Sequence, residues 1–550
     1  MFKARPLGRD KRAHRWAGLL VTTLIATLLA APSLAPAQTA DAAGCQRIGA
    51  IKLVRVDVFD TRIPEEDNAL FRLANWLHIQ TRESTVHQQL LFKTGDAYDP
   101  RLLQESERVL RSTGYIGNAN IRTVACPDGE AEIEVTTQDV WTLKPSISFG
   151  RSGGKNSSSI GIEESNLLGL GTQLGLDVKS GVDRNTRTLF YRDPLLGGQR
   201  LDLSGTYANN SDGKARSLAL DRPFYALDSR WAAGASWRNE TRVDSAYEQG
   251  EMVGQYQTTE HYAKVYGGLS EGLHGGWVRR WTLGITHDEH RATPLATNTL
   301  PNVSSPITRK LVYPWVGFEW LQDEYQTVRN QDQIGKTEDL QLGWHGTALL
   351  GAAAPAFGAD RSAAVFSVKL YKGWQPLPDT TLLFDASATG RIEREGFAGT
   401  LLKASARHYL RQSDKRSLYL ALSTERVSNP DADQQVLLGG DTGLRGYPLR
   451  YQSGHGRWLF TAEQRYFTDW YPWRLFNVGG AVFYDMGRAW DQNPNTQIPQ
   501  GLLRDFGFGL RLGNSRSAIG SVVHIDVAFP LDGDRSIRKV QFLVEGKSSF

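Results

Sequence analysis

The sequence predicts a large antiparallel β-barrel that crosses a membrane, preceded by one small α/β domain. Apolar and polar residues alternate over most of the chain after residue 144, as they do in a strand with two different faces. The 550 residues include 55 Gly, 15 Trp, 19 Tyr and 21 Phe but only 3 Met, a composition that favours strands over helices. After the first 40 residues no run approaches the ~20 consecutive apolar residues of a spanning helix, which excludes a helical membrane protein.

Residues 1–37 have the form of an export signal. A basic segment is followed by an apolar stretch from Trp16 to Ala31 and by an A-x-A cleavage site that ends at Ala37. The whole chain has a formal net charge of +4. Without this segment it has 57 basic and 58 acidic residues, a net charge of −1. The mature chain is therefore nearly neutral, and nucleic acid is not an expected partner.

Residues 38–143 are predicted to form the small α/β domain. Ile51 to Val58 read as a strand, and Leu70, Leu73, Ala74 and Leu77 recur at helical spacing. A short helix is expected from Val86 to Phe92. A longer one is expected to start at Pro100 with Asp99 as its N-cap, to carry Leu103, Ser106 and Leu110 on one face, and to end at Gly114. Two strands, 115–124 and 130–137, complete the domain around a Pro-Asp-Gly turn.

The two cysteines, Cys45 and Cys126, both fall in this domain. An oxidising compartment allows them to form a disulfide. The bond would close a loop of ~80 residues, which is worth ~4 kcal/mol on the chain-entropy model. Cys45 precedes the first strand of the domain and Cys126 follows the second-to-last. If the last strand, 130–137, is central in a mixed sheet, both cysteines lie near the same end of that sheet.

Residues 144–550 are predicted to form the barrel. Phe506, Phe508, Leu510 and Leu512 alternate with Gly507, Gly509 and Arg511, and similar segments of about ten residues recur throughout. A soluble array of β-sandwiches would also alternate, but it would repeat at ~100 residues with linkers, and the sequence has neither. Strands of this kind must close into a barrel when they cross a bilayer. The hydrocarbon region has no water to bind backbone N–H and C=O groups, so each of them must be paired within the protein. Some twenty strands can be counted, and sixteen is compatible with the soft boundaries.

A Gly-rich segment in a long loop, residues 439–447, contains Arg445-Gly446-Tyr447. With this motif the chain resembles the outer-membrane assembly superfamily typified by BamA and TamA, whose longest extracellular loop carries an R-G-[FY] tip. Asn166 to Gly171 is similar to an early hairpin turn of that family. Val540, Phe542 and Val544 alternate before the terminal Phe550, as in the family's C-terminal recognition strand.

The resemblance has consequences for both domains. The N-terminal unit is similar to a polypeptide-transport-associated (POTRA) domain, with the order strand, helix, helix, strand, strand. The resemblance implies a sixteen-strand barrel in the bacterial outer membrane and a periplasmic N-terminal domain. This sequence has one such domain where the best-known members carry several, and more strands before the loop than sixteen would allow.

The loop arginine also has a direct physical interpretation. A guanidinium inside a polar lumen keeps its proton and needs carboxylates, which its fork can bind with two hydrogen bonds. In the family the arginine meets acidic residues on the next strands, and Glu463 and Asp485 occupy those positions. We therefore expect Arg445 to pair with Glu463 and Asp485.

Signals for covalent chemistry are weak. Residues 150–154 match the G-x-S-x-G pattern of a nucleophile elbow, but no helix is expected after them, so we interpret the segment as a turn. Residues 287–290 carry ligand-type side chains at a strand end rather than on a helix. The chain is therefore predicted to be no enzyme and to need no cofactor or metal.

The predicted function follows the resemblance: insertion or translocation of client polypeptides, bound through the periplasmic domain, by a barrel in contact with outer-membrane lipids. The N-terminal domain would offer an edge strand, 115–124, to a client. The first strand, about 146–150, and the last, 540–550, would form a weak seam. The alternatives are a two-partner secretion transporter, which usually has two periplasmic domains and a plug helix, and a passive pore.

Overall fold

The computed structural model describes residues 44–248, 250–295, 307–431, 434–490, 501–514, 516, 522–533, 535 and 537–547. The predicted signal segment, residues 1–37, and the terminal Phe550 lie outside the described residues. No helix in these ranges is long and apolar enough to cross a membrane.

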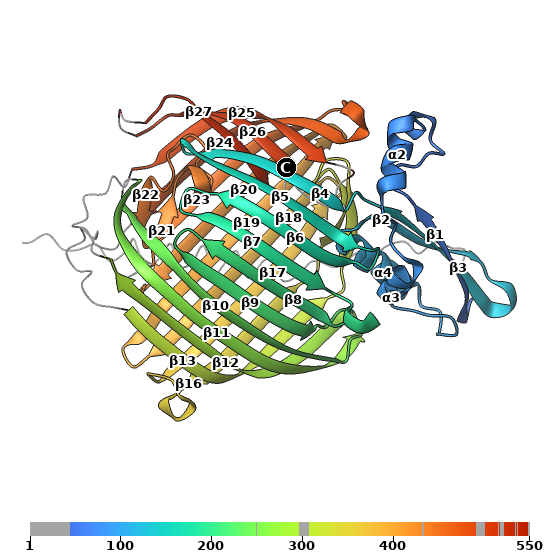
Figure 1. The fold of residues 1–550 in the computed structure, drawn as a ribbon, viewed down its shortest axis with the longest axis horizontal. Coiled ribbons are helices and arrows are strands. Elements are labelled where there is room, and N and C mark those ends of the chain that lie inside the picture. The colour runs from blue at the N-terminus through green and yellow to red at the C-terminus, as the bar shows by residue number, and fades with distance from the viewer. Residues whose placement is uncertain are drawn as a thin grey trace, which may run out of the picture.

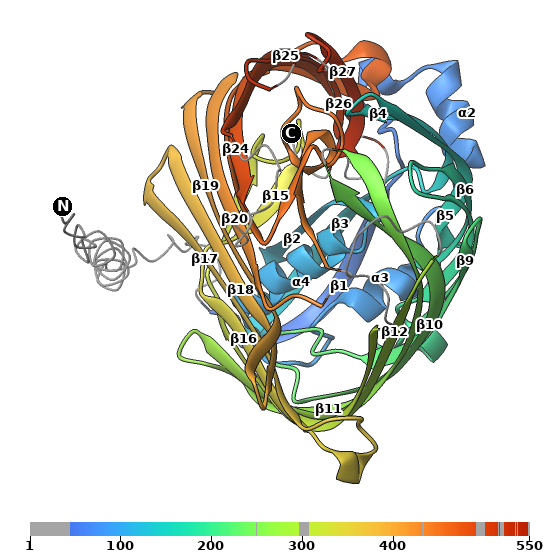
Figure 2. The same ribbon diagram turned by 90° about the vertical axis from the view of Figure 1, so that its left-hand side faces the viewer.

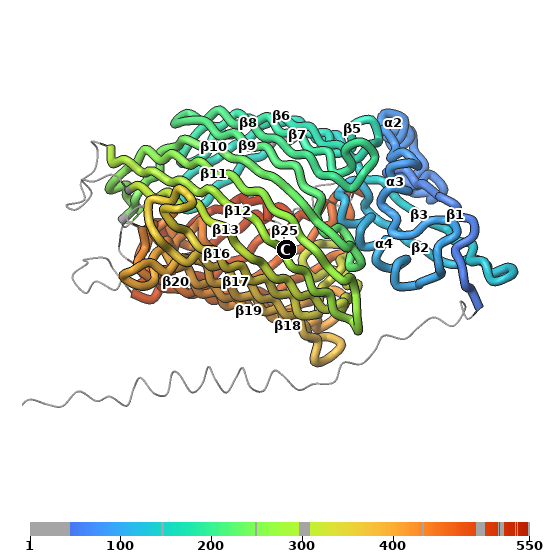
Figure 3. The backbone as a smooth tube through the Cα atoms, turned by 90° about the horizontal axis from the view of Figure 1, so that it is seen from below, coloured from blue at the N-terminus to red at the C-terminus, as the bar shows by residue number. Residues whose placement is uncertain are grey.

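The N-terminal unit is a three-stranded sheet covered by helices at one end of the molecule (Figures 1 and 3). Its elements are β1 (Arg47–Val56), α2 (Ala69–Leu77), α3 (Glu83–Gln89), α4 (Pro100–Ser112), β2 (Ile116–Ala125) and β3 (Glu130–Asp139). β3 is central, parallel to β1 and antiparallel to β2. Helices form at all three segments with helical signals in the sequence, so the unit has one helix more than the order strand, helix, helix, strand, strand. α3 also begins and ends about three residues earlier than predicted.

The longest helix, α4, is built as its sequence suggests. The Asp99 side chain caps it by accepting a hydrogen bond from the Arg101 backbone N–H, and Pro100 fills the first turn, where no N–H is needed. Leu103, Ser106 and Leu110 are buried against the sheet. α4 therefore has one fixed face, and its other face is directed at the barrel.

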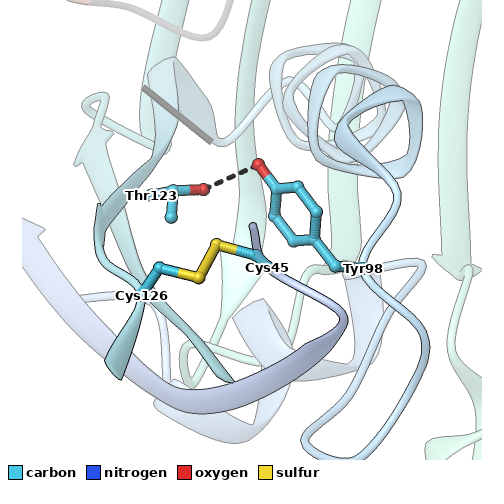
Figure 4. The surroundings of a disulfide bond; sticks show 4 residues. All are labelled: Cys45, Tyr98, Thr123 and Cys126. Carbon is cyan, nitrogen blue, oxygen red and sulfur yellow. Dashed lines mark hydrogen bonds between the residues drawn. A yellow bond between two sulfur atoms is a disulfide. The ribbon is translucent and has the colours of Figure 1, made fainter. Parts of the chain in front are cut away.

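A disulfide joins Cys45 to Cys126, with a Cα–Cα distance of 5.7 Å (Figure 4). Beside it, the hydroxyls of Tyr98 and Thr123 are hydrogen-bonded at 2.9 Å. The bond ties the chain ahead of β1 to the end of β2. Both outer strands of the sheet are thus linked at the same end.

The rest of the described chain forms one closed barrel of twenty antiparallel strands, in agreement with the count made from the alternation; the sixteen strands implied by the resemblance are wrong. In barrel order from the N-terminal side the strands are β4 (Leu143–Ser152), β5 (Lys155–Leu167), β6 (Thr172–Ser180), β7 (Asn185–Asp193), β8 (Asp202–Asn210), β9 (Gly213–Arg222), β10 (Trp231–Glu248), β11 (Glu251–His274), β12 (Trp277–Pro294), β13 (Ile307–Gln322), β16 (His345–Ala353), β17 (Ala363–Leu377), β18 (Thr380–Glu393), β19 (Gly396–Ser413), β20 (Arg416–Ser428), β23 (Gly456–Phe467), β24 (Phe476–Trp490), β25 (Leu503–Asn514), β26 (Val522–Pro530) and β27 (Gln541–Lys547).

The length predicted for the strands is wrong in the middle of the barrel. β11 has 24 residues and β10 and β12 have 18 each. A tilted crossing of a bilayer takes only about 9–11 residues. These strands therefore continue as hairpins beyond the thickness of a membrane, which the alternation alone does not reveal.

The two faces of the barrel wall differ as the alternation predicts. On β24 the outward Val482 is 55% exposed, while its neighbours Ala481 and Phe483 are 4% and 2% exposed. Phe506 and Phe508 of β25 likewise point outward. The barrel therefore presents an apolar outer surface and keeps its polar side chains inside.

The N-terminal unit lies against one end of the barrel, which we call the near end. The Thr85 hydroxyl in α3 donates to the Gly169 carbonyl in the β5–β6 turn at 2.8 Å, and Glu105 in α4 accepts from the Leu227 N–H at 2.7 Å. Seen along the barrel, α3 and α4 lie under the opening and α2 lies at its perimeter (Figure 2). The unit thus closes off part of the near end.

Candidate functional site

The long loop between β20 and β23, residues 429–455, folds into the barrel from the far end. We call it the lumen loop. Two short strands, β21 (Val436–Leu438) and β22 (Gln452–Gly454), pair within it. Leu438, Leu444 and Tyr447 are completely buried and pack with Ala489 and Leu503 of the wall. The loop is therefore a packed part of the barrel interior.

Arg445 lies at the tip of the lumen loop and is 5% exposed. Its Nε and Nη2 donate to the two oxygens of Asp485 at 2.7 and 3.0 Å, and Nη1 donates to Oε2 of Glu463 at 2.9 Å. The guanidinium also lies 3.3 Å from the centroid of the Phe483 ring, in a cation–π contact. The structure thus brings together Arg445, Glu463 and Asp485, the three residues selected from the sequence.

Further charged residues, not selected from the sequence, complete a buried cluster. Nε of Arg465 donates to Glu463 at 3.1 Å, and Nη2 of Arg511 donates to the same carboxylate at 3.2 Å. Arg511 also pairs with Asp526. The sequence did contain a signal for Arg465, Arg511 and Asp526, because all three have inward parity on their strands. Parity does not reveal which inward residues of different strands converge.

The other two motif residues are fixed by close packing. A Cβ on Gly446 would lie 2.6 Å from the Cβ of Asp505, so only glycine fits against this wall. The Tyr447 hydroxyl donates to the Arg504 carbonyl at 2.7 Å and accepts from the Arg504 N–H at 3.1 Å. Each residue of Arg445-Gly446-Tyr447 therefore has a contact of its own with the strands that follow the loop.

The lumen loop also reaches the opposite side of the seam between β27 and β4. A Cβ on Gly153, in the β4–β5 turn, would collide with the backbone of Pro448 and Leu449. Arg450 donates to both oxygens of Asp183, in the β6–β7 turn, at 2.8 and 2.6 Å. Gly153 and Gly154 of the G-x-S-x-G segment thus form the tight turn that receives the loop, whereas residues 150–152 end strand β4; β5 follows the turn, where a nucleophile elbow would need a helix.

The seam itself is weakly paired. Among the described residues one register pair, Val544 with Arg151, joins β27 to β4. On its other side β27 is paired with β26 over the whole length of β27, from Val522 opposite Lys547 to Ala528 opposite Gln541. Phe542 is 59% exposed on the outer face, and Val540 precedes the strand. The lumen loop therefore contacts both walls beside the least paired junction of the barrel.

A second element occupies the lumen at the near end. The connection between β13 and β16, residues 323–344, forms a hairpin of β14 (Tyr325–Arg329) and β15 (Thr337–Gln341), which we call the lumen hairpin (Figure 2). Its tip crosses to the opposite wall, where Asn477 donates to the Ile334 carbonyl at 2.8 Å and Tyr409 donates to Asp332 at 2.7 Å. At its base, Arg111 of α4 donates to both oxygens of Asp339 at 2.8 and 2.7 Å.

Arg465 and Glu463 connect the lumen hairpin to the lumen loop. Arg465 donates from Nη1 to the Gln331 carbonyl of the hairpin at 2.9 Å and from Nε to Glu463, the partner of Arg445. Within the hairpin, burial raises the pKa of Glu338 to about 7, although backbone N–H groups of residues 331–333 favour its charged form. One continuous polar network therefore runs from the far-end loop to α4 at the near end.

Comparisons with known proteins give structural neighbours only. No family profile matches the chain, and no curated protein matches it. Among solved structures the chain is similar to CdiB from Escherichia coli (12% identity, 98% of this chain and 99% of that one, TM-score 0.45) and CdiB from Acinetobacter baumannii (13%, 98% and 99%, 0.44). It is also similar to BamA from Haemophilus ducreyi lacking POTRA domains 1–3 (14%, 91% and 84%, 0.39).

Proposed function

We propose that this chain is an outer-membrane barrel of the BamA and TamA type, which helps client polypeptides to insert into or cross the membrane without covalent chemistry. The near end would face the periplasm, and the N-terminal unit would act as a POTRA-like domain. The export signal in the sequence, the apolar outer face of the barrel and the Arg445-Gly446-Tyr447 loop support this proposal.

One observation carries the proposal: a barely paired seam is bridged from inside by the lumen loop. Unpaired strand edges are templates for another strand, so a client hairpin can add to β4 or β27 when the seam opens. The loop contacts β23 and β24 through Arg445 and the β4–β5 turn through Leu449. It is therefore placed to hold the two walls together until a client arrives.

The occupied lumen argues against a passive pore. A barrel of sixteen to eighteen strands already encloses a water-filled channel, and larger ones hold a plug. Here the lumen loop and the lumen hairpin enter from opposite ends. A two-partner secretion transporter would have to move both of them to pass its client, whereas insertion at the seam requires release of the lumen loop alone.

The N-terminal unit would present a sheet edge to clients. β2, the strand expected to do so, is at an edge, but α4 already occupies two of its outward groups: Arg111 donates to the Ala119 carbonyl at 2.8 Å and the Ile121 N–H donates to Glu107 at 2.6 Å. β1 is the other edge, where Gly95 and Asp96 pair with Ile48. A client strand would add to the middle of β1, or to β2 after α4 shifts.

A disulfide across the seam tests the proposal. Val544 and Arg151 are register partners, and antiparallel partners lie within the Cα separation that a disulfide needs. Val544→Cys with Arg151→Cys should abolish assembly of other outer-membrane proteins under oxidising conditions. The matched control is Leu510→Cys with Ile525→Cys, which links the register partners of β25 and β26 and should leave assembly intact. If the locked seam still supports full activity, clients pass through the lumen or do not use this barrel.

A further inference from the structure

Helix α2 carries an exposed apolar face formed by Leu70, Leu73, Trp76 and Leu77. These side chains are 70%, 51%, 79% and 57% exposed. The positions i, i+3, i+6 and i+7 fall on one stripe of a helix. A soluble domain rarely leaves such a stripe uncovered, so the α2 face points to a partner.

The helix is held firmly, with this face directed away from the domain. Phe71 stacks on Phe59 with ring centroids 4.0 Å apart, and Asn75 exchanges two hydrogen bonds with the Phe59 backbone at 2.8 and 3.1 Å. Asn68 caps the first turn by accepting from the Phe71 N–H at 3.0 Å. The orientation of the α2 face is therefore set by the opposite side of the helix.

α2 is also attached to the barrel at the β23–β24 turn, residues 468–475. Leu475 packs against the cluster of Val58, Phe59 and Phe71, and Arg474 pairs with Glu65 at 3.8 Å. The same turn exposes Trp470 and Trp473, which are 64% and 75% exposed. Trp473 has a φ of 52°, a conformation that bulky residues rarely adopt, and it stands out from the turn.

Exposed apolar side chains occur on three connected parts of the molecule. They are Val482 on the outer face of β24, Trp470 and Trp473 in the turn that precedes β24, and the α2 face, whose helix packs through Phe71 in the same cluster as Leu475 of that turn. Tryptophan is enriched where a bilayer meets water, because its ring is apolar and its N–H can reach the polar zone. In Figure 2, α2 lies at the perimeter of the ring of strands, where a surrounding membrane would be.

We propose that the α2 face rests in the headgroup region of the periplasmic leaflet and anchors the N-terminal unit to phospholipid beside the barrel. An interfacial helix sinks its apolar face about 5–10 Å into the boundary between headgroups and acyl chains. The anchor would lie at the near end of β23 and β24, a few strands from the seam. This inference rests on the proposed membrane location of the barrel, and the experiment separates the two.

Single cysteines with an environment-sensitive fluorophore test the anchor in the full chain, since both native cysteines are in a disulfide. The protein is reconstituted in vesicles of phosphatidylethanolamine and phosphatidylglycerol that contain nitroxide-labelled phosphatidylcholine. Leu73→Cys reports on the α2 face. Arg72→Cys, 57% exposed on another face of the same helix, is the matched control, and Val482→Cys reports on the barrel wall.

The anchor predicts a specific quenching pattern. Leu73→Cys should lose more emission to a nitroxide near the headgroup than to one deep in the acyl chains, and should resist iodide. Arg72→Cys should be quenched mainly by iodide. If Val482→Cys is quenched by lipid but both α2 labels respond equally to iodide, the anchor is wrong and the barrel assignment stands.

Two further outcomes would also contradict the proposal. If labelled Leu73→Cys resists iodide without lipid quenching, and the unlabelled variant forms disulfide-linked dimers under oxidising conditions, the α2 face binds a second copy of the chain. If Val482→Cys itself escapes lipid quenching, the membrane location of the barrel fails, and the anchor fails with it.

Discussion

Arg445 illustrates how a single side chain can fix a loop inside a wide barrel. It uses three of its nitrogens on two carboxylates and places its plane against Phe483. Taking the charges out of water is costly, and the loss is offset only while all partners stay in place. The geometry therefore makes the site sensitive to the removal of any one of them.

The first prediction follows from this sensitivity. Arg445→Ala should destabilise docking of the lumen loop by ~3–5 kcal/mol, because Glu463 and Asp485 lose a buried counter-charge. Arg445→Lys should recover only part of that loss, since lysine has the charge without the fork. Protease cleavage between Leu437 and Arg450 measures loop release, and assembly activity should fall in parallel.

A double-mutant cycle with Asp485→Asn checks that the two residues act through one contact. The double variant should be less affected than the sum of the single variants. Strict additivity with unchanged loop cleavage would contradict this contact. Arg411→Ala, at an exposed arginine of β19, serves as the control and should leave the loop in place.

The second prediction concerns the disulfide. Replacing Cys45 and Cys126 by alanine should lower the free energy of unfolding of the N-terminal unit by ~4 kcal/mol, because an 81-residue separation is no longer closed in the unfolded chain. Hydrogen exchange of β1 to β3 in the full chain would measure the change. Two free thiols in the unreduced native protein would contradict the bond.

The sequence could predict the centre of the site but not its extent. Arg445, Glu463 and Asp485 follow from a motif and from strand parity. Arg465, Arg511 and Asp526 have the same parity, but their convergence depends on the register and curvature of four neighbouring strands. Those quantities are set by the closure of the whole barrel, and they are not encoded in any local pattern.

At the scale of elements, the lumen hairpin is the part that sequence reasoning missed. β14 and β15 have five residues each, and their alternation does not distinguish them from wall strands. α2 was predicted as a helix, but its exposed face was not. In both cases the local pattern indicates a strand or a helix. What that strand or helix packs against depends on parts of the chain that are distant in sequence.

The third prediction is a pH dependence of hairpin docking. Burial raises the pKa of Glu338 from 4.5 to about 7, so the docked hairpin binds a proton that the released one gives up. Docking should be strongest below pH ~4.5 and should lose up to about 3 kcal/mol as the pH rises through 7. Hydrogen exchange of residues 325–341, corrected for the intrinsic effect of pH, would report the loss.

Substitution of the same residue provides the check. Glu338→Gln stays neutral and keeps an oxygen for the N–H groups of Gln331 and Asp332, so its exchange should not vary with pH beyond the intrinsic effect. Glu395→Gln, at an exposed far-end turn, should behave like the unaltered protein. An unchanged pH profile in Glu338→Gln would assign the effect to another group.

At the scale of the whole molecule, the number of strands could be predicted, because twenty could be counted from the alternation. The family resemblance also placed the arginine loop late in the barrel, and the lumen loop lies there, between β20 and β23. The occupation of the lumen from both ends could not be predicted. It arises because two connections from opposite ends turn inward and are linked through Glu463 and Arg465, while α4 supports the hairpin through Arg111. The lumen is therefore occupied by two elements arranged in series along the barrel axis.

The fourth prediction follows from that series arrangement and uses ion conductance in planar bilayers. Elements in series add their resistances, so removing one leaves the other in control. Deletion of residues 436–456 alone should raise conductance only modestly, and so should replacement of residues 325–341 by a flexible linker. The two changes together should produce the steady conductance of an open barrel of this size. Full conductance after the loop deletion alone would mean that the hairpin does not close the near end, and that Arg445 and its carboxylates form the whole barrier.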